Sequence, residues 1–65
     1  MKQYTIVEFL KDHPTREKYV EQFGEYFIFF GKIPNMSGHC LLMEMETKKM
    51  WVLETRMFVA KKESK

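Results

Sequence analysis

Apolar residues near the start of the chain recur at the spacing of a helix. Ile6, Phe9 and Leu10 fall at positions i, i+3 and i+4, and the segment that leads into them fits a helix capping box. The pattern predicts a short helix over residues 5–12. It ends there because the residue before Pro14 is sterically driven out of helical geometry.

A second apolar stripe follows within residues 15–23. Tyr19, Val20 and Phe23 would lie on one side of a helix there, with charged or amide side chains on the other side. Gly24 stands where a helix C-cap needs a residue with a left-handed backbone. Because isolated helices of this length are unstable in water, both predicted helices must pack on another element.

The most apolar stretch of the chain is a run of five large side chains at residues 26–30, four of them aromatic. Such residues favour strands, and glycines flank the run. With the later pattern, it predicts a strand over residues 25–30, a loop over residues 31–38, a strand over residues 39–45, a turn over residues 46–49 and a strand over residues 50–60. The predicted fold class is α+β, with two short N-terminal helices packed on a three-stranded antiparallel meander (α-α-β-β-β).

Alternation assigns each strand residue to one of two sheet faces. On the first predicted strand, Tyr26, Ile28 and Phe30 share one face, whereas Phe27 and Phe29 share the other. The later strands also carry large apolar groups on both faces, although two short helices can cover only one. Either the sheet curls toward a small barrel that encloses one face, or the second face meets another chain.

Length and composition indicate a small folded domain. The 65 residues are predicted to form a single domain, residues 1–65, with a frayed basic tail over residues 60–65. Cys40 is the only cysteine, so no intrachain disulfide is expected and the reducing cytoplasm is the expected compartment. No apolar stretch has the length of a membrane span, and the N-terminus lacks the pattern of a signal peptide.

Few residues in the chain suit catalysis. His39 and Cys40 are adjacent in a predicted strand, so they should point to opposite faces and cannot act together as base and nucleophile. The histidines and the cysteine lack the paired spacing of a zinc site, and no glycine-rich phosphate loop is present. We therefore expect no catalytic or metal-binding residues, no cofactor and no small-molecule substrate, and we interpret the protein as not an enzyme.

Basic residues concentrate toward the C-terminal end. The net charge is +2, but residues 48–65 carry six basic and two acidic groups, which makes this segment +4. Beside sheet aromatics, basic groups can neutralise phosphates while the rings stack on bases, so a small nucleic-acid-binding module is the alternative function. The residues assigned to it are Lys32, Lys48, Lys49, Arg56, Lys61 and Lys62.

One stretch resembles the aromatic strand of RNA-recognition motifs. Gly24, Phe27, Ile28 and Phe30 match that strand, but the residues at positions 23, 25 and 26 do not. The chain also lacks the βαββαβ order of that family. We therefore interpret this match as accidental.

The leading prediction is a non-enzymatic protein that binds another protein through an aromatic-rich sheet face, as an inhibitor or modulator or as a dimerising adaptor. In its methionine-rich, aromatic-rich, single-domain style the chain resembles small standalone proteins of phages and mobile elements, many of which bind and block a host protein. Large aromatics and arginine dominate interface energetics. The predicted partner-binding residues, for a foreign protein or a homodimer, are Phe27, Phe29, Ile33, Met36, Trp51, Arg56 and Phe58.

Overall fold

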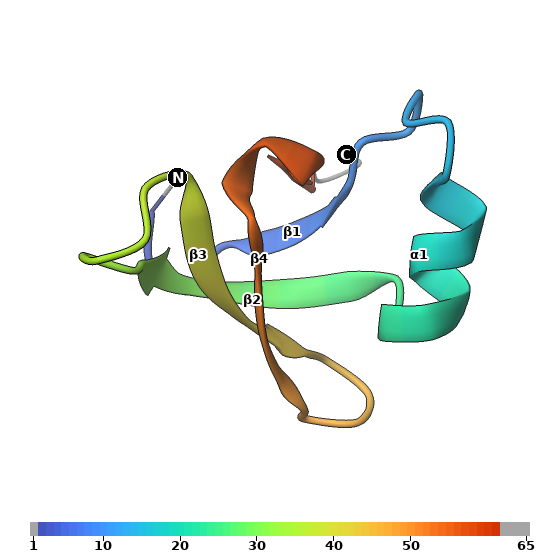
Figure 1. The fold of residues 1–65 in the computed structure, drawn as a ribbon. Coiled ribbons are helices and arrows are strands. Elements are labelled where there is room, and N and C mark those ends of the chain that lie inside the picture. Colours follow the sequence, from blue (N-terminus) through green and yellow to red (C-terminus); the bar gives the residue numbers. More distant parts are fainter. Residues whose placement is uncertain (1, 62–65) are drawn as a thin grey trace.

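The computed structural model describes residues 2–61, which form one α-helix and a five-stranded antiparallel sheet (Figure 1). The elements in chain order are β1 (Ile6–Phe9), α1 (Arg16–Phe23), β2 (Tyr26–Lys32), β3 (His39–Glu44), β4 (Met50–Glu54), the 3₁₀ turn η1 (Thr55–Met57) and β5 (Phe58–Ala60). The strand order in the sheet is β4-β3-β2-β1-β5. Within the described range, no helix has the length and apolar character needed to cross a membrane.

The prediction of two helices on a three-stranded meander is wrong, first because the segment predicted as helix 5–12 contains strand β1. Val7 pairs with Phe27 of β2 and with Ala60 of β5, so this short strand has a partner on each side. Val7 and Phe9 are both buried in the core, which places residues two apart on one face as in a strand, while Glu8 between them is buried on the opposite face. A two-turn helix has little stability of its own, so pairing within the sheet overrides the helical spacing.

The second error concerns the strand predicted over residues 50–60, which is interrupted by η1. β4 pairs with β3, but after the turn the chain pairs with β1, where Phe58 lies opposite Phe9 and Val59 opposite Glu8. The turn also changes which side chains point inward. Uninterrupted alternation would place Phe58 on the face opposite to Trp51, whereas in the structure Phe58 is buried in the core.

The core is built on one face of the sheet, which we call the inner face. Its fully or nearly fully buried apolar residues are Val7, Phe9, Phe27, Phe29, Cys40, Leu42 and Phe58. The Phe9 ring lies at its centre, stacked on Phe58 at 4.6 Å and edge-on to Phe27 at 5.5 Å between ring centroids. Helix α1 adds Tyr19 and Phe23 to this cluster.

The sheet is strongly bent, and this bend lets so few residues enclose a core. The β2–β3 register shifts between Phe29 and Gly31, and Gly31 has a φ of 144°, which glycine adopts without strain. In Figure 1 the β3–β4 hairpin consequently runs across β1 and β2, and α1 lies beside the start of β2. The curled sheet and α1 together cover the inner face and leave the opposite face uncovered.

Glu44 is a charged residue on the inner face, and it organises the turn before β4. Its carboxylate accepts hydrogen bonds from the backbone N–H groups of Thr47 at 2.7 Å and Glu46 at 3.1 Å. Burial raises the pKa of the Glu44 carboxyl, but these hydrogen bonds outweigh burial and hold the pKa below its ordinary value. An ideal Cβ on Gly24 would lie 2.4 Å from Glu44 Cγ, so the end of α1 approaches this carboxylate closely.

Candidate functional site: the outer face of the sheet

The outer face of the sheet, opposite the core, carries apolar side chains from four neighbouring strands. They are Ile6, Ile28, Leu41, Met43, Met50 and Val52. Ile28 lies opposite Ile6 on one side and opposite Met43 on the other, and Met43 lies opposite Met50. Directly opposed residues in an antiparallel sheet have adjacent side chains, so the register joins these residues into one continuous apolar surface.

Much of this surface is open to solvent. Met50 is 46% exposed, Val52 44% and Ile6 39%, while the residues between them on β2 and β3 are partly shielded by their neighbours. Each of these side chains is large and apolar, and neither α1 nor any loop of the described chain covers the set. Contiguous apolar surface of this kind is uncommon on monomeric proteins and is typical of protein-binding sites.

Charged residues border the outer face near the end of β1 and the start of β2. Glu8 lies opposite Tyr26, and the Arg16 guanidinium lies 3.8 Å from Glu8 and 4.0 Å from Glu25. The Lys61 ammonium sits 4.8 Å from the centroid of the Tyr26 ring. An apolar centre with a charged rim is the usual organisation of a protein interface.

Three of the sequence-predicted partner-binding residues belong to the core instead. Phe27, Phe29 and Phe58 are at most 5% exposed and pack against one another or against Phe9. They cannot contact a partner while the fold is intact, so these three are removed from the set. Trp51 is half-buried and packs edge-on against Phe23 at 4.7 Å, which makes it mainly a link between β4 and α1.

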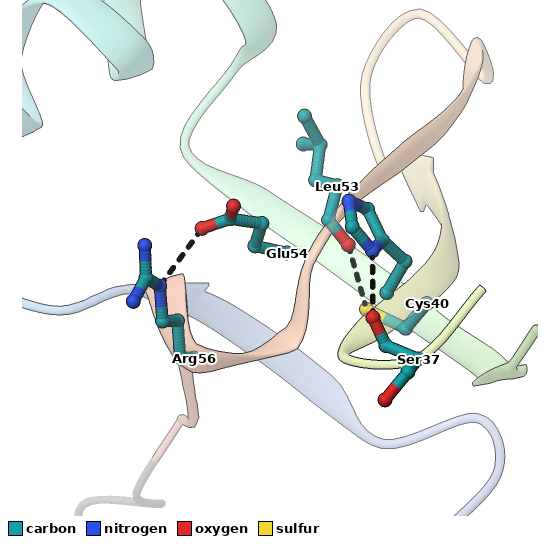
Figure 2. A network of polar contacts seen from close by, with 6 residues as sticks. Ser37, Cys40, Leu53, Glu54 and Arg56 are labelled. Atoms are coloured by element: carbon teal, nitrogen blue, oxygen red, sulfur yellow. Dashed lines mark hydrogen bonds and ion pairs between the residues drawn. The ribbon is translucent and has the colours of Figure 1, made fainter.

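The other predicted partner-binding residues lie outside the core but in separate elements. Ile33 is half-buried and Met36 exposed in the loop between β2 and β3. Arg56 extends from η1 into solvent, where its Nε donates to Glu54 Oε2 at 2.8 Å (Figure 2). The structure therefore does not gather the predicted set into one surface.

The basic residues of the alternative function are also dispersed. Lys48 and Lys49 lie in the β3–β4 turn, whereas Lys32 lies opposite Cys40, near the far end of β3. A strand of this length spans about 20 Å, so these groups do not form one phosphate-binding patch. Arg56 follows the far end of β4, Lys61 lies over Tyr26, and Lys62 falls outside the described residues.

His39 and Cys40 have separate surroundings, as their alternation predicts. His39 Nδ1 lies 3.0 Å from the Ser37 carbonyl, whereas the fully buried Cys40 thiol contacts the Leu53 carbonyl at 3.6 Å (Figure 2). The two side chains thus engage different partners. Across residues 2–61, no cluster of three or more histidine, cysteine, aspartate or glutamate side chains is placed to hold a metal ion.

The sequence separates the two faces of β2, but none of the predicted partner-binding residues belongs to the outer face. The row on β2 that includes Ile28 was separated correctly from the row that includes Phe27, and only the covered row remained to be identified. The signal that could have decided it is polarity, because Tyr26 gives the other row a hydroxyl, whereas Phe27 and Phe29 are wholly apolar. No family model, no curated protein and no solved structure matches this chain.

Proposed function

We propose that this protein acts by binding another protein through the outer face of its sheet. The observation that supports the proposal is the uncovered apolar row that runs through Ile6, Ile28, Met43 and Met50 across four strands. Burial of apolar side chains is the main driving force of protein association. An exposed row of apolar side chains is unfavourable in water, and binding of a partner would bury it. The protein then has a binding role rather than a catalytic one.

The dimensions of the molecule fit such a role. A standard protein interface takes about 800 Å² from each partner. The surface of this chain is 5054 Å², so an interface of that size would occupy roughly a sixth of it. One face of the sheet with its rim is a sufficient share, and binding there would block the partner's own surface or bring two partners together. These are the inhibitor and adaptor forms of the proposal.

Nucleic-acid binding has less support because the cationic groups are separated while the exposed face is apolar. If it occurred, it would weaken steeply as the salt concentration rises, since each phosphate contact releases counterions. Binding of a fluorescent single-stranded oligonucleotide, measured at low and at physiological salt, distinguishes the two functions. We expect no saturable binding at low salt.

The experiment that tests the proposal compares the wild-type chain with the double variant Ile28→Thr/Met43→Thr. Threonine keeps strand propensity but removes apolar surface from the centre of the outer face. Proteins captured from the native host by each form are identified by mass spectrometry, and each candidate is then purified and titrated calorimetrically. We expect a partner whose affinity for the double variant is at least tenfold lower.

Lys18→Thr is the matched control, because Lys18 is an exposed residue of α1 away from this face. It should retain wild-type affinity. Equal affinity of every identified partner for the double variant, with its fold shown intact by circular dichroism, would contradict the proposal.

A further inference from the structure

The two edge strands of the sheet, β4 and β5, differ in how many of their backbone N–H and C=O groups form hydrogen bonds. In the β3–β4 ladder, Glu44 N–H donates to Lys49 O at 2.8 Å, and Thr55 N–H donates to Gly38 O at 2.8 Å. Since antiparallel ladders alternate, Trp51 and Leu53 also direct their backbone groups toward β3. The residues between them direct their backbone N–H and C=O groups away from the sheet.

The groups that face outward on β4 therefore belong to Met50, Val52 and Glu54. Their N–H groups and the Met50 and Val52 carbonyls take part in no loop or turn hydrogen bond of the described chain, whereas the Glu54 carbonyl, at the N-cap of η1, accepts the first bond of that turn. They stand two residues apart, which is the spacing that an added antiparallel strand uses. Natural sheets normally protect such an edge with proline, a bulge, a charge or a covering loop. On β4 only Glu54, at its end, is charged.

The opposite edge, β5, is protected. It has three residues, Phe58–Ala60, and the Phe58 N–H is already bonded to the Thr55 carbonyl of η1. Lys61 N–H returns to Ile6 O at 2.9 Å, on the β1 side. β5 thus directs only the Phe58 carbonyl and the backbone groups of Ala60 outward, and this shorter edge leaves β4 as the edge better suited to pairing.

A hollow of about 340 Å³ lies along β4 at this edge of the sheet, and residues from both faces line it. It is lined by Tyr19, Phe23, His39, Val52, Leu53, Glu54 and Met57. These side chains come from α1, β3, β4 and η1, and most of them are apolar. Successive side chains of an added strand alternate in direction, so one set would enter this hollow and the other would extend the outer face beside Met50 and Val52.

The charge at the two ends of β4 gives the added strand a direction. Lys48 and Lys49 precede the strand, and neither forms an ion pair with the described part of the chain. At the other end, Glu54 and Arg56 neutralise each other. In an antiparallel arrangement the C-terminal end of the incoming strand lies beside the two lysines, so acidic groups there are favoured.

We propose that β4 accepts an extended segment of another protein as a sixth, antiparallel strand, and that this segment alternates apolar residues and ends in acidic ones. The inference rests on the proposed function and specifies its mode. The bound segment gains main-chain hydrogen bonds from Val52 and Glu54 and places an apolar side chain in the hollow.

The test uses three synthetic heptapeptides. One alternates valine and threonine and ends in two glutamates, the second ends in two lysines, and the third carries a central proline. Binding is followed by two-dimensional NMR of the labelled full chain. We expect the glutamate peptide to shift the amide signals of residues 50–54, to slow hydrogen exchange at Val52 and Glu54, and to bind at least tenfold more tightly than the other two.

The variant that isolates the edge is Val52→Pro. It deletes an N–H that points away from β3, so no bond of the sheet is lost, while Val52→Thr retains that N–H. Val52→Pro should abolish peptide binding, whereas Val52→Thr removes some apolar surface but keeps the N–H and should therefore weaken binding only in part. If the proline variant does not fold, the inference is tested by hydrogen exchange at Val52 and Glu54 of the wild-type chain in the presence of the glutamate peptide.

Absence of protection at Val52 and Glu54 at millimolar glutamate peptide would overturn the inference. Self-association that Val52→Pro abolishes would assign the edge to a second copy and overturn it as well. A partner that loses affinity for Ile28→Thr/Met43→Thr but not for Val52→Pro would overturn this mode alone and leave the proposed function standing.

Discussion

The two faces of this sheet are built from similar side chains but have different surroundings. Phe27 is fully buried, whereas Ile28, the next residue on the same strand, lies on the open outer face. Both are large and apolar, and each lies opposite an apolar residue of β1, although Phe27 also lies opposite Glu44 of β3. What separates them is the bend of the sheet and the position of α1, which close over the inner face only. Hydrophobicity alone therefore does not distinguish a core from a binding surface in so small a chain.

The inner face should account for most of the stability. Phe27→Ala removes a fully buried ring, so we expect a loss of about 3–5 kcal/mol in the free energy of unfolding. A domain of this size has about that much in total, so the variant should be largely unfolded. Ile28→Ala should cost less than about 2 kcal/mol, because the outer residue is already partly solvated. Urea denaturation measures the free energy of unfolding of both variants. Equal decreases would show that the two faces contribute equally to stability, which would contradict the prediction.

The contact between α1 and the inner face should be nearly as sensitive. Gly24→Ala places a Cβ 2.4 Å from Glu44 Cγ at a residue whose φ is 114°. Backbone strain alone costs about 1–3 kcal/mol, and the collision adds to it. Gly38→Ala is the matched control, because Gly38 also has a positive φ of 78° but its Cβ would meet nothing within 4 Å. A thermal melt in which both variants lose equally would show that the close approach to Glu44 is unimportant.

The charged residue of the inner face should make stability depend on pH. The pKa of Glu44 is lower in the folded chain than its ordinary value of 4.5, so its stabilising contribution is present above that value and is lost as the pH falls through the folded pKa. Glu44→Gln should lower stability by about 1–3 kcal/mol at neutral pH. The difference from the wild-type chain should shrink in acid. Denaturation at a series of pH values tests this, and a constant difference down to pH 2 would contradict it.

The outer face should contribute least to folding. Met50→Thr and Val52→Thr each replace an exposed side chain by a residue that favours strands, so we expect changes within about 0.5 kcal/mol. The same substitutions reduce the apolar surface available to a partner. If chemical denaturation showed that the free energy of unfolding falls by several kcal/mol, this face would contribute to the stability of the fold, which would contradict the expectation.

Local patterns predicted those elements in which residue type and spacing agree with the pairing and packing that the structure supplies. The stripe of Tyr19, Val20 and Phe23 followed by Gly24 indicated the helix that the structure contains as α1. The aromatic run likewise indicated β2. The helical spacing of Ile6 was misleading, because strands β2 and β5 flank β1 and their pairing outweighs a short helix.

The sequence by itself determined that two apolar faces exist on β2, since alternation follows from backbone geometry alone. It also indicated a chain without strong catalytic patterns and with more apolar surface than two short elements could cover. Only the tertiary structure decided that Phe27 lies inside and Ile28 outside, that η1 moves Phe58 into the core, and that β4 is the open edge. These outcomes depend on long-range strand pairing and on the bend at Gly31, and no local pattern specifies which face a curled sheet encloses.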